Sequence, residues 1–197
     1  MVYETRRLLI RPFASDDLRA IHRILDQAFG DGRLADDPAA LGERAGWLAW
    51  SALSQEWLPK LHQPPYGDQA IALKSSGEVV GAVGYVPLLM PFEQLAELGG
   101  VPAGSAQATP EVGLFWAVDP AHQRQGYAIE AAQALVEHAF REWRLKRILA
   151  TTDHDNLASQ GVMRKLGMTL ARNPQPEPPW MQVVGILVTA QLSSRGM

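Results

Sequence analysis

Residues 123–128 combine features that suit the binding of a phosphate group. They follow an alternating run that predicts a strand, and a run with helical spacing begins near Gly126. The first N–H groups of a helix lack partners and lie at the positive end of its dipole, so they attract phosphate oxygens. Gly126 allows close approach to its backbone, Ala128 is small, and Arg124 adds a positive charge. An ordinary strand-to-helix turn with one glycine is the alternative interpretation.

Other phosphate and metal chemistries find no support in the chain. The loop is neither a G-x-G-x-x-G fingerprint nor a Walker loop, which needs a G-K-[ST] sequence. The absence of cysteine excludes disulfides, zinc thiolate sites and thiol nucleophiles. The five histidines form no H-E-x-x-H pair, so we expect no metal site.

Length and composition predict one globular domain spanning residues 1–197. Hydrophobic residues make up 47% of the chain, enough for a full core. A net charge of -3 gives no electrostatic reason to expect nucleic acid or a membrane surface as a partner. The longest apolar stretch, residues 79–92, is interrupted by glycine and proline and falls short of the ~20 residues that cross a bilayer. With no cleavable leader visible, we expect a soluble, cytoplasmic protein.

The hydrophobic pattern predicts the elements that position the loop. Their order is strand, two helices, three strands, helix, strand, helix and two strands. Ser15 is the expected N-cap of the first helix. The predicted ranges are 6–13, 16–29, 37–61, 69–74, 78–86, 111–118, 126–143, 147–152, 156–166, 168–171 and 182–191. Residues 87–110 form a proline- and glycine-rich insertion, in which residues 92–98 are expected to add a helical turn or two.

The loop also resembles the acetyl-CoA signature of the GNAT acetyltransferases. The core of that signature is [Q/R]-x-x-G-x-[G/A], and Gln123, Gly126 and Ala128 match it. Residues 156–159 and 164–168 resemble the N-x-x-S and K-L-G-F segments of the same family, in the expected order.

The beginning of the chain resembles one branch of this family in particular. Residues 6–12 are similar to the opening of the branch that includes the ribosomal-protein N-terminal acetyltransferases, the RimJ/RimL-like enzymes. Apart from residues 87–110, the resemblance covers nearly the whole chain. It implies a mixed α/β fold: a mostly antiparallel seven-stranded sheet with a parallel, splayed central strand pair and helices on both faces.

The resemblance implies that acetyl-CoA is the co-substrate and indicates which residues hold it. Asn156 would reach the CoA arm near the thioester; alternatively, it caps the following helix, and both roles are compatible. Backbone N–H groups of the loop would hold the pyrophosphate, and the end of the preceding strand would pair with the pantetheine amides. The residues of the loop are Gln123, Arg124, Gln125, Gly126, Tyr127 and Ala128. The residues at the end of the strand are Trp116, Ala117 and Val118.

The implied reaction is direct attack of a primary amine on acetyl-CoA in a ternary complex. Glu111 is the candidate base, with an exposed strand-end glutamate as the equal alternative and His154 as a weaker candidate. The tyrosine that many family members use as an acid is absent from residues 161–163. Ser159 could protonate the thiolate instead, or simply pack or cap. A mechanism without a dedicated acid also stays open.

The acceptor is less closely defined. Similarity favours the α-amine of a protein or peptide, and a small-molecule amine stays open. We expect residues 87–110 and 173–180 to border the acceptor site or a contact in a homodimer, because long ordered loops tend to carry function. A non-catalytic acyl-CoA-binding module, or an interaction protein that keeps only the fold, is the competing interpretation.

Overall fold

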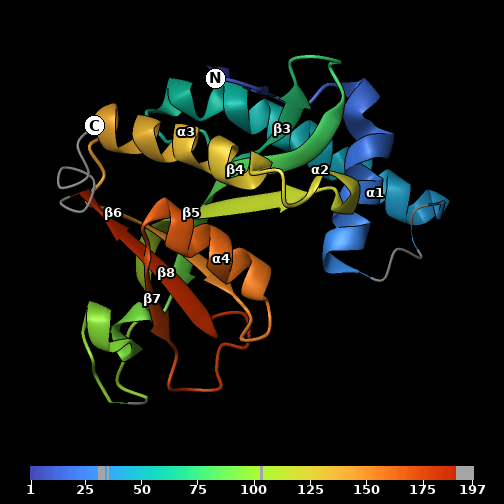
Figure 1. Cartoon of the computed structure of the whole chain (residues 1–197). Helices are drawn as coiled ribbons and strands as arrows, with labels where there is room; N and C mark the ends of the chain where they lie inside the picture. The colour runs from blue at the N-terminus through green and yellow to red at the C-terminus, as the bar shows by residue number, and fades with distance from the viewer. Residues whose placement is uncertain (31–33, 35, 103, 190–197) are drawn as a thin grey trace. The chain divides into compact units, whose positions relative to one another are not determined.

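A computed structural model describes residues 1–30, 34, 36–102 and 104–189 of the chain (Figure 1). The strands are β1 (Tyr3–Glu4), β2 (Leu8–Arg11), β3 (Gly67–Leu73), β4 (Val79–Met90), β5 (Thr109–Val118), β6 (Arg147–Thr152), β7 (Thr169–Arg172) and β8 (Val183–Val188). The α-helices are α1 (Leu18–Phe29), α2 (Pro38–Trp57), α3 (Tyr127–Arg141) and α4 (Leu157–Leu166). Single 3-10 turns are η1 (Ser15–Asp17), η2 (Pro59–Leu61), η3 (Phe92–Gln94), η4 (Ala96–Leu98) and η5 (Pro120–His122).

Within the described residues the strands form one eight-stranded sheet in the order β1-β2-β3-β4-β5-β6-β8-β7. Strands β5 and β6 run parallel and meet at Gly113 and Leu149. The sheet is otherwise mostly antiparallel, which confirms the predicted fold class. The strand missing from the seven predicted is β1, where Tyr3 pairs with Ile10. Two residues are too few to show a period of two in the sequence.

The chain forms two compact units. The first comprises Met1–Val86 and Phe115–Leu135, and the second comprises Pro87–Leu114 and the described part of Val136–Met197. The boundaries fall inside β4, β5 and α3, so these elements belong partly to each unit.

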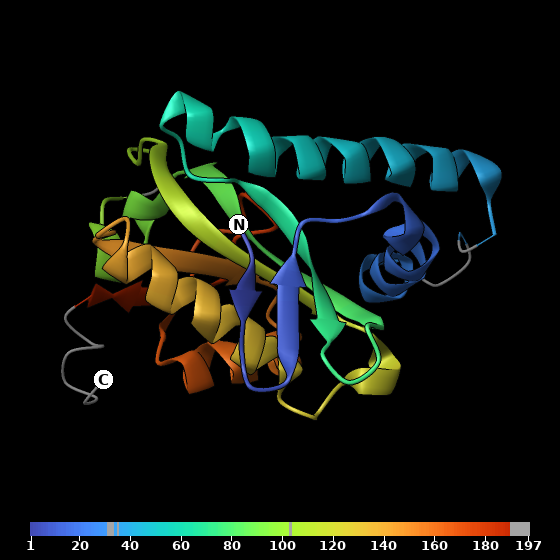
Figure 2. The same cartoon turned by 90° about the horizontal axis from the view of Figure 1, so that it is seen from above.

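In the first unit, helices cover β3 and β4 on two faces (Figure 2). Side chains of β3 alternate between the faces. Ala70 of β3 lies on the face that α1 and α2 cover. Tyr85 of β4 contacts α3 instead: its hydroxyl donates to the carbonyl of Leu135 at 2.6 Å. The core between α1, α2 and the sheet consists of Phe13, Ile21, Ile24, Leu25, Leu48, Ala70, Val79, Ala82 and Ala117.

In the second unit, part of the insertion packs on the sheet. Residues 92–98 form η3 and η4, which confirms the predicted helical turns. The side chain of Gln94 donates to Asn173 Oδ1 at 2.8 Å and to the carbonyl of Glu177 at 3.0 Å. The two loops that the sequence marks as unusual are therefore bonded to each other. The insertion also contributes to a core that consists of Phe92, Leu95, Leu149, Ala171, Met181, Val184 and Ile186.

Several predicted boundaries differ from the structure. Ser15 is not an N-cap: a 3-10 turn precedes α1, and the Asp17 carboxylate accepts from the Ala14 N–H at 2.7 Å. The second helix ends at Trp57, before η2. Strand β4 extends to Met90, so the insertion is shorter than predicted. Residues 190 and 191 of the predicted last strand lie outside the described residues. Among the described helices, none combines the length and apolar character that crossing a membrane requires.

Candidate functional site

Asp119 ends β5 and fixes the direction of the candidate loop. Asp119 is 3% exposed, and its N–H donates to the carbonyl of Val80 at 2.9 Å. Its carboxylate accepts from Arg23 Nη2 at 2.6 Å and from the N–H of Ala121 at 2.9 Å. Because one carboxylate joins α1 to the first turn after the strand, the loop leaves β5 along a fixed path.

The same contacts keep Asp119 ionised. Burial alone would raise the pKa of its carboxyl. The hydrogen bonds from Arg23 and Ala121, with the charges of Arg23 and His122, outweigh burial and hold the pKa below its ordinary value of 3.8.

The backbone from Gln123 to the start of α3 takes an unusual course. Gln123 is extended, and its side chain donates to the carbonyl of Val118 at 3.1 Å. Arg124 (φ 59°) and Gly126 (φ 84°) are left-handed. Such a conformation in a non-glycine residue costs on the order of 1 kcal/mol and is often found at functional sites. Turns with left-handed residues gather successive N–H groups into a concave anion site.

The donors of this loop are available. The N–H groups of Arg124, Gln125 and Gly126 form no hydrogen bond among the described residues. The N–H groups of the first turn of α3 lack intrahelical partners, as at every helix start. The side chains of Gln123, Arg124 and Gln125 are exposed, so none is buried over the backbone donors. The loop therefore has the donor geometry for a phosphate ligand.

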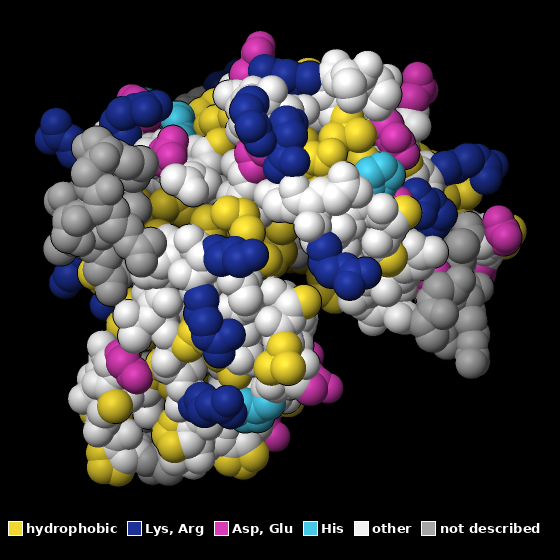
Figure 3. All heavy atoms as spheres, in the orientation of Figure 1, with side chains coloured by type: hydrophobic (Ala, Val, Ile, Leu, Met, Phe, Trp, Pro, Cys, Tyr) yellow, Lys and Arg dark blue, Asp and Glu magenta, His cyan; other side chains and the backbone are white. Residues whose placement is uncertain are grey.

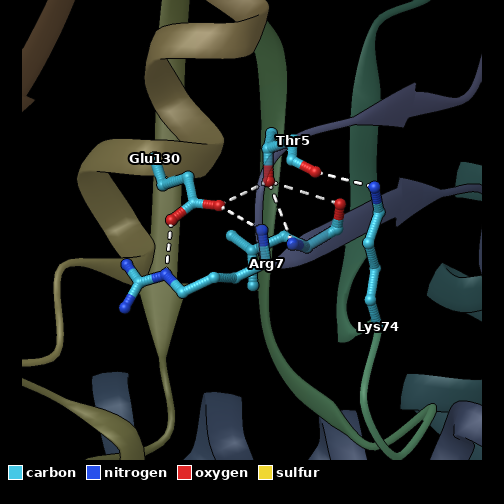
Figure 4. A network of polar contacts seen from close by, with 5 residues as sticks. Thr5, Arg7, Lys74 and Glu130 are labelled. Carbon is cyan, nitrogen blue, oxygen red and sulfur yellow. Dashed lines mark hydrogen bonds and ion pairs between the residues drawn. The ribbon is translucent and has the colours of Figure 1, made fainter.

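A polar network fastens the start of α3 to the β1–β2 turn (Figure 4). Glu130 Oε1 accepts from Thr5 Oγ1 at 2.6 Å and from the N–H of Arg7 at 2.8 Å, and Oε2 accepts from Arg7 Nε at 2.7 Å. Lys74 Nζ donates to the carbonyl of Thr5 at 2.7 Å. These contacts of Glu130 are all directed at the turn, so the helix start has a fixed position within the unit.

Arg7 brings positive charge to the loop. Its guanidinium carbon lies 4.5 Å from the centre of the Tyr127 ring, and its Nη2 lies 3.4 Å from where a Cβ on Gly126 would be. In the space-filling view, basic side chains gather near the beginning of α3 (Figure 3). Sequence reasoning missed this role, because Arg7 and Glu130 are 123 residues apart and no local pattern connects them.

Glu111, in the second unit, forms an ion pair with Arg147. Both carboxylate oxygens accept from this guanidinium, Oε2 from Nε at 2.9 Å and Oε1 from Nη2. The hydrogen bond to Glu111 raises the pKa of Arg147. A proton transferred to Glu111 would have to compete with a bidentate partner, so the ion pair opposes a role as base. The catalytic assignment of Glu111 stays a prediction.

Asn156 and Ser159 lie together at the start of α4, also in the second unit. Asn156 Oδ1 accepts from the N–H of Ser159 at 3.0 Å, so Asn156 is the N-cap. This confirms the structural alternative for Asn156 and leaves its amide nitrogen available. The Ser159 side chain is half-buried. His154, just upstream, is exposed, with Nδ1 3.4 Å from Arg172 Nη1.

The remaining predicted residues lie at the end of β5 in the first unit. Trp116 is half-buried, whereas Ala117 and Val118 are buried. The carbonyl of Ala117 faces Gly81 so closely that a Cβ there would collide with it. The structure thus joins the loop to Arg7, and Asn156 to Ser159, each within its own unit. In the part of the chain that is described, no three His, Asp or Glu side chains are placed to hold a metal ion.

Comparison with known sequences identifies the family. Residues 7–169 match the profile of the acetyltransferase (GNAT) domain. The uncharacterized N-acetyltransferases YnaD and YjdG of Bacillus subtilis are 48% identical over 60 residues and 29% identical over 113 residues. These alignments cover 30% and 57% of this chain, and 34% and 57% of the relatives' own lengths. The chain belongs to the GNAT acetyltransferase family, which agrees with the predicted enzyme class, an acyltransferase.

Solved structures share the fold. The acetyltransferase from Agrobacterium tumefaciens superposes with a TM-score of 0.67 at 24% identity, covering 95% of this chain and 94% of that one. A ribosomal L7/L12 α-N-protein acetyltransferase in complex with coenzyme A superposes with a TM-score of 0.58 at 16% identity, covering 94% and 96%. At these identities the likeness establishes the GNAT fold and leaves the acceptor open.

Proposed function

We propose that the chain transfers the acetyl group of acetyl-CoA to a primary amine by direct attack in a ternary complex. The observation that carries this proposal is the loop after β5. Its left-handed Arg124 and Gly126 and its free N–H groups have the geometry of an anion site, in a chain of the GNAT family. The resemblance of residues 6–12 to ribosomal-protein acetyltransferases favours a protein or peptide α-amine as the acceptor.

In this proposal the N–H groups of residues 124–128 bind the pyrophosphate of acetyl-CoA. The N–H of Gln123, which the sequence also assigned to the pyrophosphate, donates to the carbonyl of Pro120 at 3.4 Å instead. Arg7 contributes a positive charge beside Gly126, held in place by Glu130. Backbone groups of Trp116, Ala117 and Val118 pair with the pantetheine, and the amide of Asn156 contacts the CoA arm. In this arrangement main-chain N–H groups bind the pyrophosphate, and the side chains of Arg7 and Asn156 add contacts that the main chain of the loop does not provide.

The reaction forms one bond and breaks another. The amine nitrogen attacks the thioester carbonyl carbon, the C–S bond breaks, and the thiolate of CoA leaves. The amine must first be neutral, which is easier for an α-amine (pKa ~8) than for a lysine (pKa ~10.4). Glu111 stays the candidate base and Ser159 the candidate donor to the thiolate.

Substitution of Gly126 tests the cofactor site. Gly126→Glu places a negative charge in the loop and a side chain on a left-handed residue, so acetyl-CoA affinity should fall by at least about 100-fold, or ~2.7 kcal/mol. Isothermal calorimetry measures the affinity. Gly77→Glu is the matched control, since Gly77 is also left-handed (φ 76°) but lies in the β3–β4 turn. Equal affinities in the two variants would contradict the proposal.

A non-catalytic acyl-CoA-binding module is the second candidate, since residues 161–163 lack the tyrosine that many family members use. Release of free thiol from acetyl-CoA in the presence of amines distinguishes the two. Acetyl-CoA binding without amine-dependent thiol release would favour the binding module. A homodimer and a cytoplasmic location stay predictions from the sequence.

A further inference from the structure

Four polar side chains on α2 and β3 of the first unit contain a buried atom with no hydrogen-bond partner among the described residues. The atoms are Arg44 Nε, Ser51 Oγ, Gln55 Oε1 and Asp68 Oδ1. Ser51, Gln55 and Asp68 are 0%, 6% and 9% exposed. Native proteins leave few such atoms unpaired, so each one requires an explanation. We call these four residues the α2–β3 polar cluster.

The fold brings the cluster together. Asp68 lies two residues before Ala70 on β3, so both face α1 and α2. It pairs with Gly84, and a Cβ on Gly84 would lie only 2.6 Å from Asp68 Oδ1. A larger residue there would therefore collide with the backbone of Gly67 and Asp68 as well as with the carboxylate.

Helix α2 supplies the other oxygens. Ser51 and Gln55 are one helical turn apart and both are buried. The Cα of Ser51 lies 3.6 Å from where a Cβ on Gly67 would be, next to Asp68. Gln55 Nε2 donates to the carbonyls of Pro65 at 2.8 Å and Gly67 at 3.3 Å. These bonds orient the amide and leave its carbonyl oxygen as the unpaired atom.

The charges of Asp68 and Arg44 in the cluster compensate each other only partly. Burial raises the pKa of the Asp68 carboxyl to about 7, against the opposing charge of Arg44. Burial also lowers the pKa of Arg44, against the charges of Asp26 from α1 and Asp68. No hydrogen bond joins Arg44 to Asp68 in the described structure; the Arg44 guanidinium lies 5.0 Å from the Trp47 ring centre. On β4, the residue opposite Asp68 is Gly84, which carries no charge.

The unpaired atoms define the chemistry of a ligand. Gln55 Oε1 and the Asp68 carboxylate accept hydrogen bonds, and the Ser51 hydroxyl can accept one. A primary ammonium group has three N–H donors, a positive charge and no acceptor. An anionic ligand would find only Arg44 Nε as a complementary atom and would face the Asp68 carboxylate. The chemistry of the unpaired atoms therefore matches an ammonium group.

We propose that Ser51, Gln55 and Asp68 bind the ammonium group of the amine acceptor, and that Asp68 takes up its proton. The proton passes from R–NH3+ to the Asp68 carboxylate, leaving a neutral amine with its lone pair and a carboxylic acid. In this inference Asp68 takes the place of Glu111 as the base, because Glu111 is occupied by the bidentate guanidinium of Arg147 and Asp68 is not. The inference rests on the proposed acetyl transfer for its role, whereas ammonium binding can be tested without it.

Binding is measured first, by 13C NMR of the aspartate carboxyl carbons in the wild-type chain. Asp68→Asn assigns the resonance, which should titrate well above the ordinary range of an aspartate. Glycinamide, a primary amine, should shift the resonance and lower its apparent pKa. N-acetylglycinamide, which lacks the ammonium group, should do neither. If glycinamide leaves the resonance unmoved, or the two probes act alike, the inference is overturned.

Steady-state kinetics tests the proton transfer to Asp68. Asp68→Asn should lower kcat/KM for the amine by about 10- to 100-fold and remove the acidic limb of its pH profile, with acetyl-CoA affinity unchanged. Ser51→Ala should raise KM for the amine several-fold, whereas Ser54→Ala, on the same helix, should not. Wild-type kinetics and pH profile in Asp68→Asn would contradict the proton transfer. Should Asp68→Asn misfold, the comparison of Ser51→Ala with Ser54→Ala decides.

The two proposals fail differently. If wild type acetylates no amine but glycinamide still shifts Asp68, acetyl transfer is wrong and ammonium binding stands. If wild type acetylates glycinamide and Asp68 does not respond to it, acetyl transfer stands and the cluster is not the acceptor site.

Discussion

At the residue scale, Glu130 shows how one half-buried carboxylate can support a loop. Burial alone would raise its pKa, but hydrogen bonds from Thr5 and Arg7 and the Arg7 charge outweigh burial and hold the pKa below 4.5. The unfolded chain therefore binds this proton more tightly. The contribution of Glu130 to stability is present above pH ~4.5 and is lost as pH falls through its folded pKa.

Glu130→Gln should reduce the free energy of unfolding by about 1–3 kcal/mol at pH 7, since charge-assisted hydrogen bonds are lost. The difference from wild type should shrink as pH falls below ~4.5, where wild type becomes protonated too. Urea unfolding at a series of pH values measures both. Glu56→Gln, which breaks the exposed pair with Lys60, is the control and should change little. A pH-independent difference would contradict the linkage.

Asn156 allows its cap and ligand roles to be separated. Asn156→Ala should destabilise the chain by about 1 kcal/mol, whereas Asn156→Asp keeps an N-cap oxygen for the N–H of Ser159. If the amide contacts CoA, both variants should lose acetyl-CoA affinity in calorimetry. If Asn156→Asp binds as wild type does, Asn156 is only a cap.

Some residue-level features could be predicted from the sequence and others could not. The role of Gly126 at a helix start depends on neighbours within a few residues, and the structure gives it the left-handed backbone that glycine favours. The ion pair between Glu111 and Arg147 could not be predicted, because the two residues are 36 positions apart in the sequence. The α2–β3 polar cluster could not be predicted, because none of its four residues belongs to a motif in its own segment of the sequence.

At the element scale, the contact between η3 and the segment after β7 gives the insertion a structural role. Gln94→Ala removes the hydrogen bonds to Asn173 and Glu177. The free energy of local opening should fall by about 1–3 kcal/mol, because the buried Asn173 Oδ1 loses one of its two donors and the Glu177 carbonyl loses its bond from Gln94. Hydrogen exchange at the N–H of Val101, which donates to Glu93, reports the opening.

Gln107→Ala is the matched control for that experiment, because Gln107 is an exposed residue of the same insertion. Equal exchange rates in wild type and Gln94→Ala would show that the two hydrogen bonds do not order the segment.

The sequence predicted long elements better than short ones. The spacing of apolar residues located α1, α3 and α4 to within a few residues, because a stripe of buried residues repeats over several turns. Short features were less predictable. A serine before an acidic pair looked like a cap at Ser15, but Asp17 already accepts from the Ala14 N–H and from Arg11. Hydrogen bonds of Asp17 to residues three and six positions earlier therefore decided that boundary.

At the scale of the whole molecule, the two units share three elements. The chain passes from one unit to the other inside β4, β5 and α3. Neither unit can lose these elements without affecting the other, so we expect a single cooperative unfolding transition, with equal calorimetric and van't Hoff enthalpies. Two resolved transitions in scanning calorimetry would contradict the prediction of one domain.

The network around Glu130 also has a consequence for protein synthesis. Its partners Thr5 and Arg7 precede it by 125 and 123 residues. At ~5–20 residues per second, roughly 6–25 seconds of translation separate them. During that time the strands next to the β1–β2 turn lack the helix that fastens them and expose unfinished sheet to the ribosome surface and to chaperones. A nascent chain arrested before residue 130 should therefore be a target for chaperone binding and proteolysis.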